Sequence, residues 1–380
     1  MSRRSLHTPA PDAAALRARL DRAAAAAAKA DTDALLIAPG SDLRYLLGQA
    51  GGSFERLTTL VVPADGVPAL VVPKLEAPGY ADVPTAELGI EVLTWVDGDD
   101  AYRLVADRLG KPGRVAVSDF TPALHVLALR AALGDAEQTL AGPVIRELRM
   151  RKDAAEIAAL RAAGAAIDRV HARVGEWLRA GRTEAEVGQD ITAAIVEEGH
   201  SHADFVIVGS GPNGASPHHD VSDRVIQRGD VVVVDIGGPL PEGYNSDCTR
   251  TYSVGEPRDA DVAETYAVLQ RAQQAAVDEV RPGVTAERID AAAREVIEAA
   301  GFGEFFIHRT GHGIGLDVHE EPYIIAGNQL PLEPGMAFSV EPGIYQAGRW
   351  GARIEDIVVV TESGVEAFNT RPHELTVLDA

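Results

Sequence analysis

The feature that most constrains the fold of this chain is an internal repeat in its second half. At a shift of 102 positions, two helical patterns coincide, and the matched pairs are Arg179, Gly181, Thr183, Val187, Ile195 and Gly199 with Arg281, Gly283, Thr285, Ile289, Ile297 and Gly301. Four inserted residues then change the shift to 106, where Gly229, Val234, Asp235 and Gly237 match Gly335, Val340, Glu341 and Gly343. Each half therefore reads as two helices followed by strands. Two repeats cannot form a solenoid, so we expect a closed, pseudo-symmetric domain.

Each copy of the repeat carries two acidic residues at β-like segments. The apolar run VVVVD predicts a buried strand that ends at Asp235, and Asp247 follows in the alternating segment SDCTRTYSV. If GGPLPEGY reverses the chain, Asp235 and Asp247 lie on neighbouring antiparallel strands. Glu341 and Glu355 occupy the corresponding places in the second copy. One acidic residue alone is more often part of a surface ion pair, but four at matched positions indicate a two-metal site.

A histidine-containing segment, HRTGHGIGLDVHE, lies between these acidic pairs and holds His308, His312 and His319. Glycines at 311, 313 and 315 predict a close approach of the backbone to a neighbour. Two divalent cations would neutralise four carboxylates, and a neutral histidine would add a nitrogen ligand. Such a set suits manganese, cobalt, iron or zinc.

The first half of the chain reads as a separate α/β domain. Its apolar runs are ALLIA, TTLVVP, PALVVP, EVLTW and RVAVSD, and the alanine run 23–28 predicts a helix. The second and third runs predict a hairpin, because Asp65 and Gly66 accept turn dihedrals. No catalytic constellation is found here. We place the domains at residues 1–145 and 146–380, with Asp153 as the N-cap of a long helix that carries Ile157, Leu160, Ile167, Val174 and Leu178.

Composition excludes some classes of partner. The net charge of −22 argues against a nucleic-acid partner, whose phosphates need a basic surface. No stretch is apolar enough for a signal peptide or a membrane span. The single cysteine, Cys248, excludes an internal disulfide framework and is expected to be a small buried residue. We therefore expect a cytoplasmic protein that binds neither nucleic acid nor membranes.

Residues 150–375 closely resemble the pita-bread metallopeptidases, in the branch of the Xaa-Pro aminopeptidases and Xaa-Pro dipeptidases. The motifs that carry the resemblance are GPNGASPHH, VVDIGG, GYNSDCTRTY, HRTGHGIGLDVHE, SVEPGIY and RIED. The first half looks like the creatinase-like domain of that branch. The resemblance implies an α+β fold, in which a smaller creatinase-like α/β domain precedes a pseudo-symmetric pita-bread catalytic domain.

The resemblance also implies a ligand set. Asp235, Asp247, His312, Glu341 and Glu355 correspond to the ligands of two divalent metal ions. Asp247 and Glu355 would bridge the two ions, Asp235 would bind one, and His312 and Glu341 the other. Manganese is the first expectation for the metal, and cobalt, zinc and iron are alternatives.

Further roles follow from the same resemblance. His218, His319 and Glu341 are expected to be catalytic, with His319 at the scissile carbonyl and Glu341 accepting a proton from water. His218, His308, His319 and Arg353 are expected to bind substrate. Arg353 would also orient carboxylates beside Glu355, and His308 would either contact substrate or form a supporting hydrogen bond. His219, the neighbour of His218, is expected at the surface or in a supporting role.

The implied activity is a dinuclear metal-dependent hydrolysis of the Xaa-Pro bond at peptide N-termini. The substrate would be a peptide with proline at the second position, and a homodimer is expected. A metal-free creatinase-type or other small-molecule C–N hydrolase is the alternative, although the intact ligand set weakens it. A non-enzymatic binding protein on this fold is a further alternative. The sequence leaves open whether the enzyme is a dipeptidase or an aminopeptidase.

Overall fold

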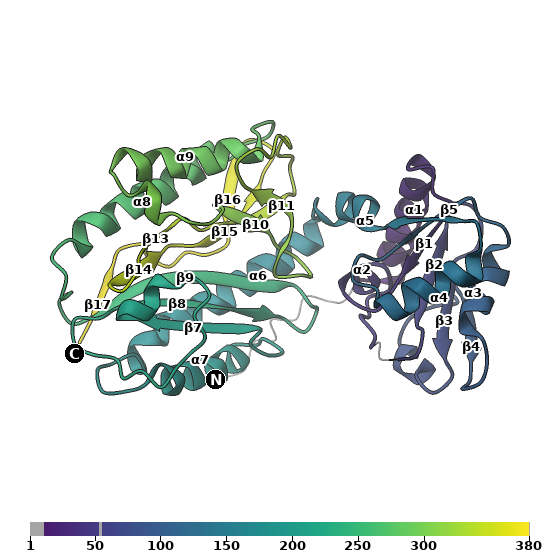
Figure 1. The fold of residues 1–380 in the computed structure, drawn as a ribbon, viewed down its shortest axis with the longest axis horizontal. Coiled ribbons are helices and arrows are strands. Elements are labelled where there is room, and N and C mark those ends of the chain that lie inside the picture. Colours follow the sequence, from purple (N-terminus) through teal and green to yellow (C-terminus); the bar gives the residue numbers. More distant parts are fainter. Residues whose placement is uncertain (1–10, 53–54, 380) are drawn as a thin grey trace. The chain divides into compact units, whose positions relative to one another are not determined.

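The structure is a computed structural model that describes residues 11–52 and 55–379. Its contacts divide these residues into two compact units, one ending at Arg149 and the next beginning at Met150 (Figure 1). The predicted boundary between residues 145 and 146 falls inside helix α5 (Gly142–Arg149), which packs against α1 of the first unit. No helix in the described ranges is long and apolar enough to span a membrane.

The first unit is built on a six-stranded sheet in the order β4-β3-β2-β1-β5-β6. The strands are β1 Ala34–Ile37, β2 Thr59–Pro63, β3 Ala69–Pro73, β4 Glu91–Trp95, β5 Arg114–Val117 and β6 Glu137–Leu140. The helices beside α5 are α1 Ala13–Lys29, α2 Ser41–Leu47, α3 Ala101–Leu109 and α4 Ala123–Leu133, with a short 3-10 turn, η1, at Ala77–Tyr80. The predicted hairpin is confirmed, because β2 and β3 pair antiparallel with Leu60 opposite Leu70. The predicted N-terminal helix is also confirmed as α1, which Asp12 caps.

The second unit contains both copies of the repeat. The first copy comprises α6 Ala154–Arg173, η2 Val174–Glu176, α7 Glu184–Glu197, β7 Phe205–Ser210, η3 Gly211–Ala215, β8 Val231–Pro239 and β9 Asn245–Val254. The second comprises α8 Val262–Glu279, α9 Ala286–Ala299, η4 Gly303–Phe305, β10 Gly311–Gly313, β11 Glu320–Ile324, β12 Ala337–Val340, β13 Gly343–Gln346, β14 Trp350–Arg353, β15 Asp356–Val360, β16 Val365–Ala367 and β17 Thr376–Leu378. These strands form sheets in the orders β17-β9-β8-β7 and β11-β10-β12-β15-β16, with β13-β14 as a separate pair.

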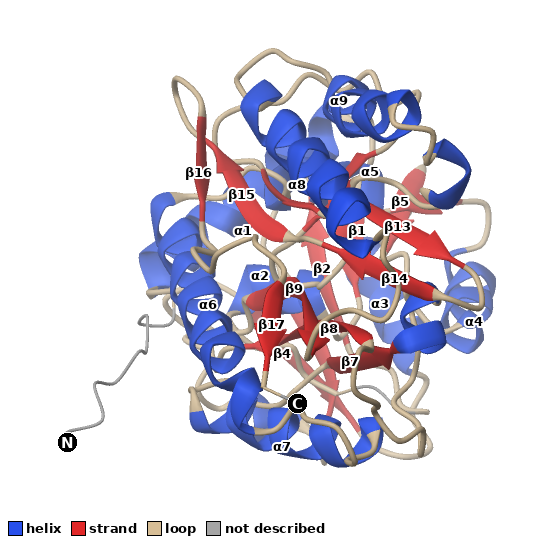
Figure 2. Cartoon of the chain, turned by 90° about the vertical axis from the view of Figure 1, so that its left-hand side faces the viewer, coloured by secondary structure: helices blue, strands red, loops and turns tan. Residues whose placement is uncertain are grey.

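Two helix pairs pack against the strands of this unit. Figures 1 and 2 both show α8 and α9 near the top of the unit and α7 near the bottom, and Figure 2 shows α6 beside the strands. The helices pack on their own sheets, α6 on β8 and β9 and α8 on β12 and β14. The two sheets also meet, since β9 contacts β15 and β8 contacts β14. Residues carried on these strands can therefore face one another across the junction of the two repeats.

The predicted repeat is confirmed in the backbone itself. Gly181 and Gly283, which match at a shift of 102, have φ of +89° and +85°, a region that favours glycine. The Gly181 N–H donates to the Ile226 carbonyl at 2.9 Å, and the matched Gly283 N–H donates to Leu332 at 2.8 Å. Because Ile226 and Leu332 differ by 106 positions, both registers of the sequence match hold in the structure.

The prediction that a strand ends at Asp235 is wrong. Strand β8 continues to Pro239, so Asp235 lies in its middle. The strand continues through the two glycines after it, which pair with β9 and which neighbouring atoms approach closely. A Cβ on Gly237 would clash with the Phe205 ring and the Ser246 carbonyl, and one on Gly238 would clash with the His202 carbonyl.

The long helix after Asp153 is shorter than predicted. Asp153 does cap α6, in a capping box with Glu156. The helix ends at Arg173, however, so Val174 lies in the 3-10 turn η2 and Leu178 lies beyond it. Both side chains are still buried in the apolar cluster around β8 and β9, which explains their helix-like spacing.

Candidate metal centre

The five side chains predicted as metal ligands come together from both repeats. Asp235 and Asp247 are carried by β8 and β9, and His312 by β10. Glu341 directly follows β12, and Glu355 lies between β14 and β15. Donor atoms lie within 4.8 Å of one another in three overlapping groups, which are Asp235–Asp247–Glu355, His312–Glu341–Glu355 and Asp247–His312–His319.

The register of β8 and β9 places both aspartates on one face. Asp235 pairs with Thr249, and Gly237 pairs with Asp247, so the two acids are diagonal neighbours across an antiparallel pair. The predicted chain reversal between them is thereby confirmed. Thr249 shares this face because strand side chains alternate, and its hydroxyl donates to Glu355 Oε2 at 2.7 Å.

In the second repeat the acids lie at strand ends. Strands β12 and β15 pair with Val340 opposite Asp356, which brings the neighbouring Glu341 and Glu355 together. The Ser339 hydroxyl accepts from the His312 backbone N–H and donates to Glu341 Oε1, both at 3.0 Å. A single serine therefore links the strand that carries the histidine to the carboxylate beside it.

The glycines around His312 allow three strands to approach closely, as predicted. A Cβ on Gly311 would clash with the Ser339 carbonyl of β12, and a Cβ on Gly313 would clash with the backbone of Glu321 in β11. The neighbour that these glycines approach is thus the sheet itself. His312 is held deep between β11 and β12 as a result.

Burial and mutual repulsion act strongly on these carboxyl groups. Burial, then the charges of Asp235 and Glu341, raise the pKa of Asp247 well above its usual range. Burial and Asp247 do the same to the pKa of Glu355. Burial raises the pKa of Glu341 to about 7, against the opposing effect of a nearby arginine. The pKa of His312 is lowered by burial and by the adjacent His319, so its ring is neutral, as metal ligation requires.

The donor set fits divalent cations. Among the described residues, Asp235 Oδ1 and Glu355 Oε1 are buried oxygens without a hydrogen-bond partner. Such acceptors are costly unless something else satisfies them, and a cation would do so. Four carboxylates and one neutral imidazole form an oxygen-rich set, which suits manganese, cobalt, iron or zinc. Cys248 is buried as predicted and packs in the apolar cluster with Ile236.

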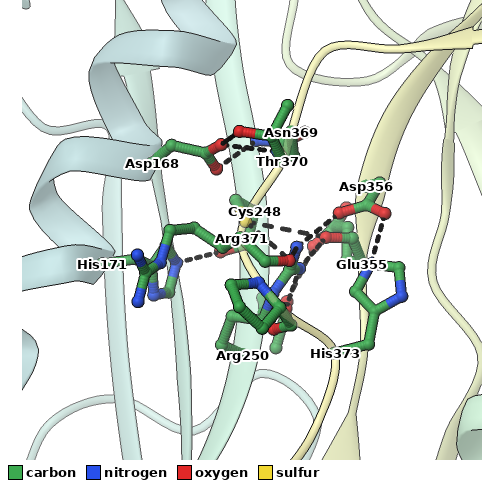
Figure 3. A network of polar contacts seen from close by, with 12 residues as sticks. Asp168, His171, Cys248, Arg250, Glu355, Asp356, Asn369, Thr370, Arg371 and His373 are labelled. Atoms are coloured by element: carbon green, nitrogen blue, oxygen red, sulfur yellow. Dashed lines mark hydrogen bonds and ion pairs between the residues drawn. The ribbon is translucent and has the colours of Figure 1, made fainter.

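A network of hydrogen bonds and ion pairs holds the backbone of Glu355 in place (Figure 3). Arg250 donates to the Glu355 carbonyl and to Asp356 Oδ1, both at 2.7 Å. His373 lies 2.7 Å from Asp356 Oδ2, and its effect and that of Arg250 lower the pKa of Asp356 although burial opposes them. The adjacent acids of RIED thus face opposite ways. Asp356 was missed from the sequence, although two successive acids at the start of a strand are a signal that both faces carry polar partners.

Arg353 pairs directly with Asp235, one of the predicted ligands. Its buried guanidinium contacts Asp235 Oδ2 directly and reaches Glu355 only through Thr249, whose hydroxyl accepts from Nε at 3.1 Å. The remaining nitrogen donates to the Tyr345 hydroxyl at 2.6 Å. Tyr345 was not singled out from the sequence, because only the pairing of β13 with β14 places it beside Arg353.

His308 and His319 flank the acidic cluster. The His308 ring bonds to the Tyr345 hydroxyl at 2.8 Å and the Arg309 carbonyl at 2.7 Å, which are supporting contacts. Burial and then Arg353 lower its pKa to about 4. His319 is exposed, with its ring centroid 3.9 Å from that of His312. His319 therefore lies at the open side of the cluster, where a substrate can reach it.

His218 lies on the segment that follows η3 and has an exposed side chain. The carbonyl before it, on Pro217, accepts from Arg353 at 3.3 Å, which ties this segment to the acidic cluster. The charge of His218 also contributes to the lowered pKa of both His308 and His319. All the predicted site residues therefore lie around one centre in the second unit.

Both units have counterparts among known proteins. The family model described as metallopeptidase family M24 matches residues 158–362, and that of the creatinase/prolidase N-terminal domain matches residues 19–151. The probable dipeptidase PepE of Mycobacterium bovis is 61% identical over 368 residues, covering 97% of this chain and 98% of that protein. The Xaa-Pro dipeptidase of Lactobacillus helveticus is 36% identical over 345 residues, covering 88% and 92%. The crystal structure of dipeptidase PepE from Mycobacterium ulcerans matches with a TM-score of 0.94 and 60% identity, covering 98% of this chain and 100% of that one.

Proposed function

The chain belongs to metallopeptidase family M24, and from that premise we propose that it is a dinuclear metal-dependent dipeptidase that hydrolyses Xaa-Pro dipeptides. The observation that carries the proposal is the convergence of four carboxylates and a neutral histidine, two of whose buried oxygens have no partner among the described residues. Ordinary ion pairing would not leave acceptors unsatisfied at the centre of such a cluster.

The choice of substrate rests on the relatives. One full-length relative is named a probable dipeptidase and another an Xaa-Pro dipeptidase. These likenesses support a dipeptide with proline at its second position over a longer peptide. We include manganese as the first metal to test and a homodimer as the expected assembly, both of which come from the family resemblance alone.

The residues divide between two metal positions. Asp235, Asp247 and Glu355 would hold one ion, and His312, Glu341 and Glu355 would hold the other. The family resemblance adds Asp247 to the second position. Two bound divalent cations would supply a water of lowered pKa as nucleophile and would polarise the scissile carbonyl. The ion pair between Arg353 and Asp235 fixes the orientation of that carboxylate before any ligand arrives.

We assign proton transfer and charge stabilisation to the side chains on the more exposed side of the acidic cluster. Glu341 is the carboxylate best placed to move a proton, because 15% of its side chain is exposed, against 4% for Asp247 and 11% for Asp235, which Arg353 already holds. It would take the proton from water and pass it to the leaving proline nitrogen. His319 would donate to the scissile oxygen as its negative charge develops. His218 would hold the proline side of the substrate, and His308 would support the site through its bonds to the Tyr345 hydroxyl and the Arg309 carbonyl.

A comparison of substrates tests the proposal. The protein, loaded in turn with manganese, cobalt and zinc, would be given Xaa-Pro dipeptides, the matching Xaa-Pro tripeptides and Xaa-Ala dipeptides. We expect rapid cleavage of Xaa-Pro dipeptides alone. Equal cleavage of tripeptides would assign an aminopeptidase instead. If none of the metal-loaded forms cleaves any of these peptides, the proposed function is wrong, and small-molecule C–N bonds become the next substrates to test.

A further inference from the structure

A buried carboxylate outside the ligand set lies at the start of α7. Glu184 directly follows the N-cap Thr183, and its side chain is fully buried. Its oxygens accept hydrogen bonds from the Ser210 backbone and hydroxyl at 2.8 and 2.6 Å, from Asn213 Nδ2 at 3.1 Å, from the Ser222 hydroxyl at 2.6 Å and from His219 Nε2 at 2.8 Å. A carboxylate this deep is tolerated only when it is so fully bonded.

The donors to Glu184 all belong to one segment, residues 210–222, which we call the His218 segment. It leaves the end of β7, passes through η3 and carries His218 towards the acidic cluster. Burial would raise the pKa of Glu184, but the hydrogen bonds from Ser210 and Ser222 lower it. Glu184 is therefore ionised, and a charged acceptor strengthens every bond that holds the segment.

His218 itself is held on both sides. The residue before it, Pro217, has its carbonyl bonded to Arg353 at 3.3 Å. The residue after it, His219, has its ring bonded to Glu184 at 2.8 Å. The exposed His218 side chain thus projects from a backbone that is tied to the acidic cluster at one end and to α7 at the other. A flexible surface loop would have neither tie.

The second repeat supports its histidines in a related way. Asp290, a buried residue of α9, accepts from the Thr310 backbone and hydroxyl at 3.0 and 2.8 Å. Thr310 lies between His308 and His312. In each repeat, a buried carboxylate of the second helix therefore anchors the segment that bears the site histidines. Recurrence at two different sequence positions favours a role at the site over a local accident of packing.

We propose that Glu184 is a positioning residue of the reaction, which holds the His218 segment through His219 and the two serines so that His218 meets the substrate. The inference rests on the proposed function, because it assigns Glu184 a role in substrate alignment. Displacement of a binding group by about 1 Å can cost about 100-fold in rate. The loss of this anchor should therefore lower the rate of hydrolysis by more than a loss of folding stability alone would explain.

A double-mutant cycle tests the inference in the full-length, manganese-loaded protein. E184Q preserves shape but removes the charge, and we expect kcat/KM for an Xaa-Pro dipeptide to fall about 10- to 100-fold with metal content unchanged. In an H218A background the same substitution should have less than about a twofold further effect, because Glu184 acts through His218. Effects that multiply in the double variant would overturn the inference and leave Glu184 a stabilising residue only.

A second pair of variants keeps the test decisive if E184Q does not fold. H219Q keeps a donor near the position of the ring Nε2 and should retain kcat/KM to within about threefold, whereas H219L should lose about 10-fold. H202L is the matched control, since His202 also pairs with a carboxylate, Asp204 at 2.7 Å, but on an exposed surface. Equal activity of H219L and H202L would overturn the inference alone. An inactive metal-loaded wild type would overturn the proposed function, and the inference with it.

Discussion

Asp235 and Glu341 occupy matched positions of the repeat but have different surroundings. Asp235 lies in the middle of β8 and is held by the guanidinium of Arg353. Glu341 lies beyond the end of β12, accepts from Ser339 at 3.0 Å and lies 3.3 Å from His312 Nε2. Duplication explains the common position, while the differing partners support the role in proton transfer that we propose for Glu341 alone.

Replacement of Glu341 by glutamine should separate ligation from proton transfer. The amide keeps an oxygen donor but cannot accept a proton, so kcat should fall about 10²- to 10⁴-fold. Under saturating manganese, elemental analysis should still find close to two ions per chain. A variant that loses activity and metal in equal proportion would show that Glu341 is a ligand and nothing more.

In the metal-free protein, the thermal stability of E341Q relative to wild type should depend on pH. The pKa of Glu341 rises from 4.5 to about 7 because the group is buried. The folded state therefore binds its proton more tightly than the unfolded chain, and this stabilisation is complete below pH 4.5 and is lost as the pH rises through about 7. Thermal unfolding of metal-free wild type and E341Q should show a melting-temperature advantage for E341Q that grows between pH 5 and about 8. A melting-temperature difference that does not change with pH would contradict the raised pKa of Glu341.

At the scale of elements, glycines explain both what sequence reasoning found and what it missed. Gly181 and Gly283 could be matched because positive φ leaves few other choices of residue. Gly237 misled the strand prediction, because a glycine that accommodates a close neighbour looks the same in sequence as one that makes a turn. Tyr345 and Glu184 were missed for another reason. Their importance comes from long-range partners, which local pattern does not encode.

Strand β10 offers a direct test of the close approach that positions His312. In G311A the new methyl group would meet the Ser339 carbonyl and hydroxyl, which should cost about 1–3 kcal/mol and displace the ligand. The matched control is G364A, because a Cβ there meets nothing within 4 Å. Thermal melting and Xaa-Pro hydrolysis should both fall for G311A and remain near wild type for G364A. Equal melting temperatures for the two variants would contradict the packing described for β10.

At the scale of the whole second unit, the centre lies where the two repeats meet. The backbone N–H of Glu355 donates to the Thr249 carbonyl of β9 at 3.2 Å, so the second repeat is hydrogen-bonded directly to a strand of the first. The acids are a repulsive cluster in a chain that already carries a net charge of −22. Bound cations would remove that repulsion and join the repeats, which couples metal binding to the stability of the unit.

The central claim is that hydrolysis depends on two metal ions held by this cluster. The most direct measurement strips the protein of metal, verifies the removal by elemental analysis, and follows Xaa-Pro dipeptide hydrolysis as manganese is added back. We predict no hydrolysis in the stripped protein and full recovery near two equivalents of metal per chain. Undiminished hydrolysis in the verified metal-free protein would contradict the account.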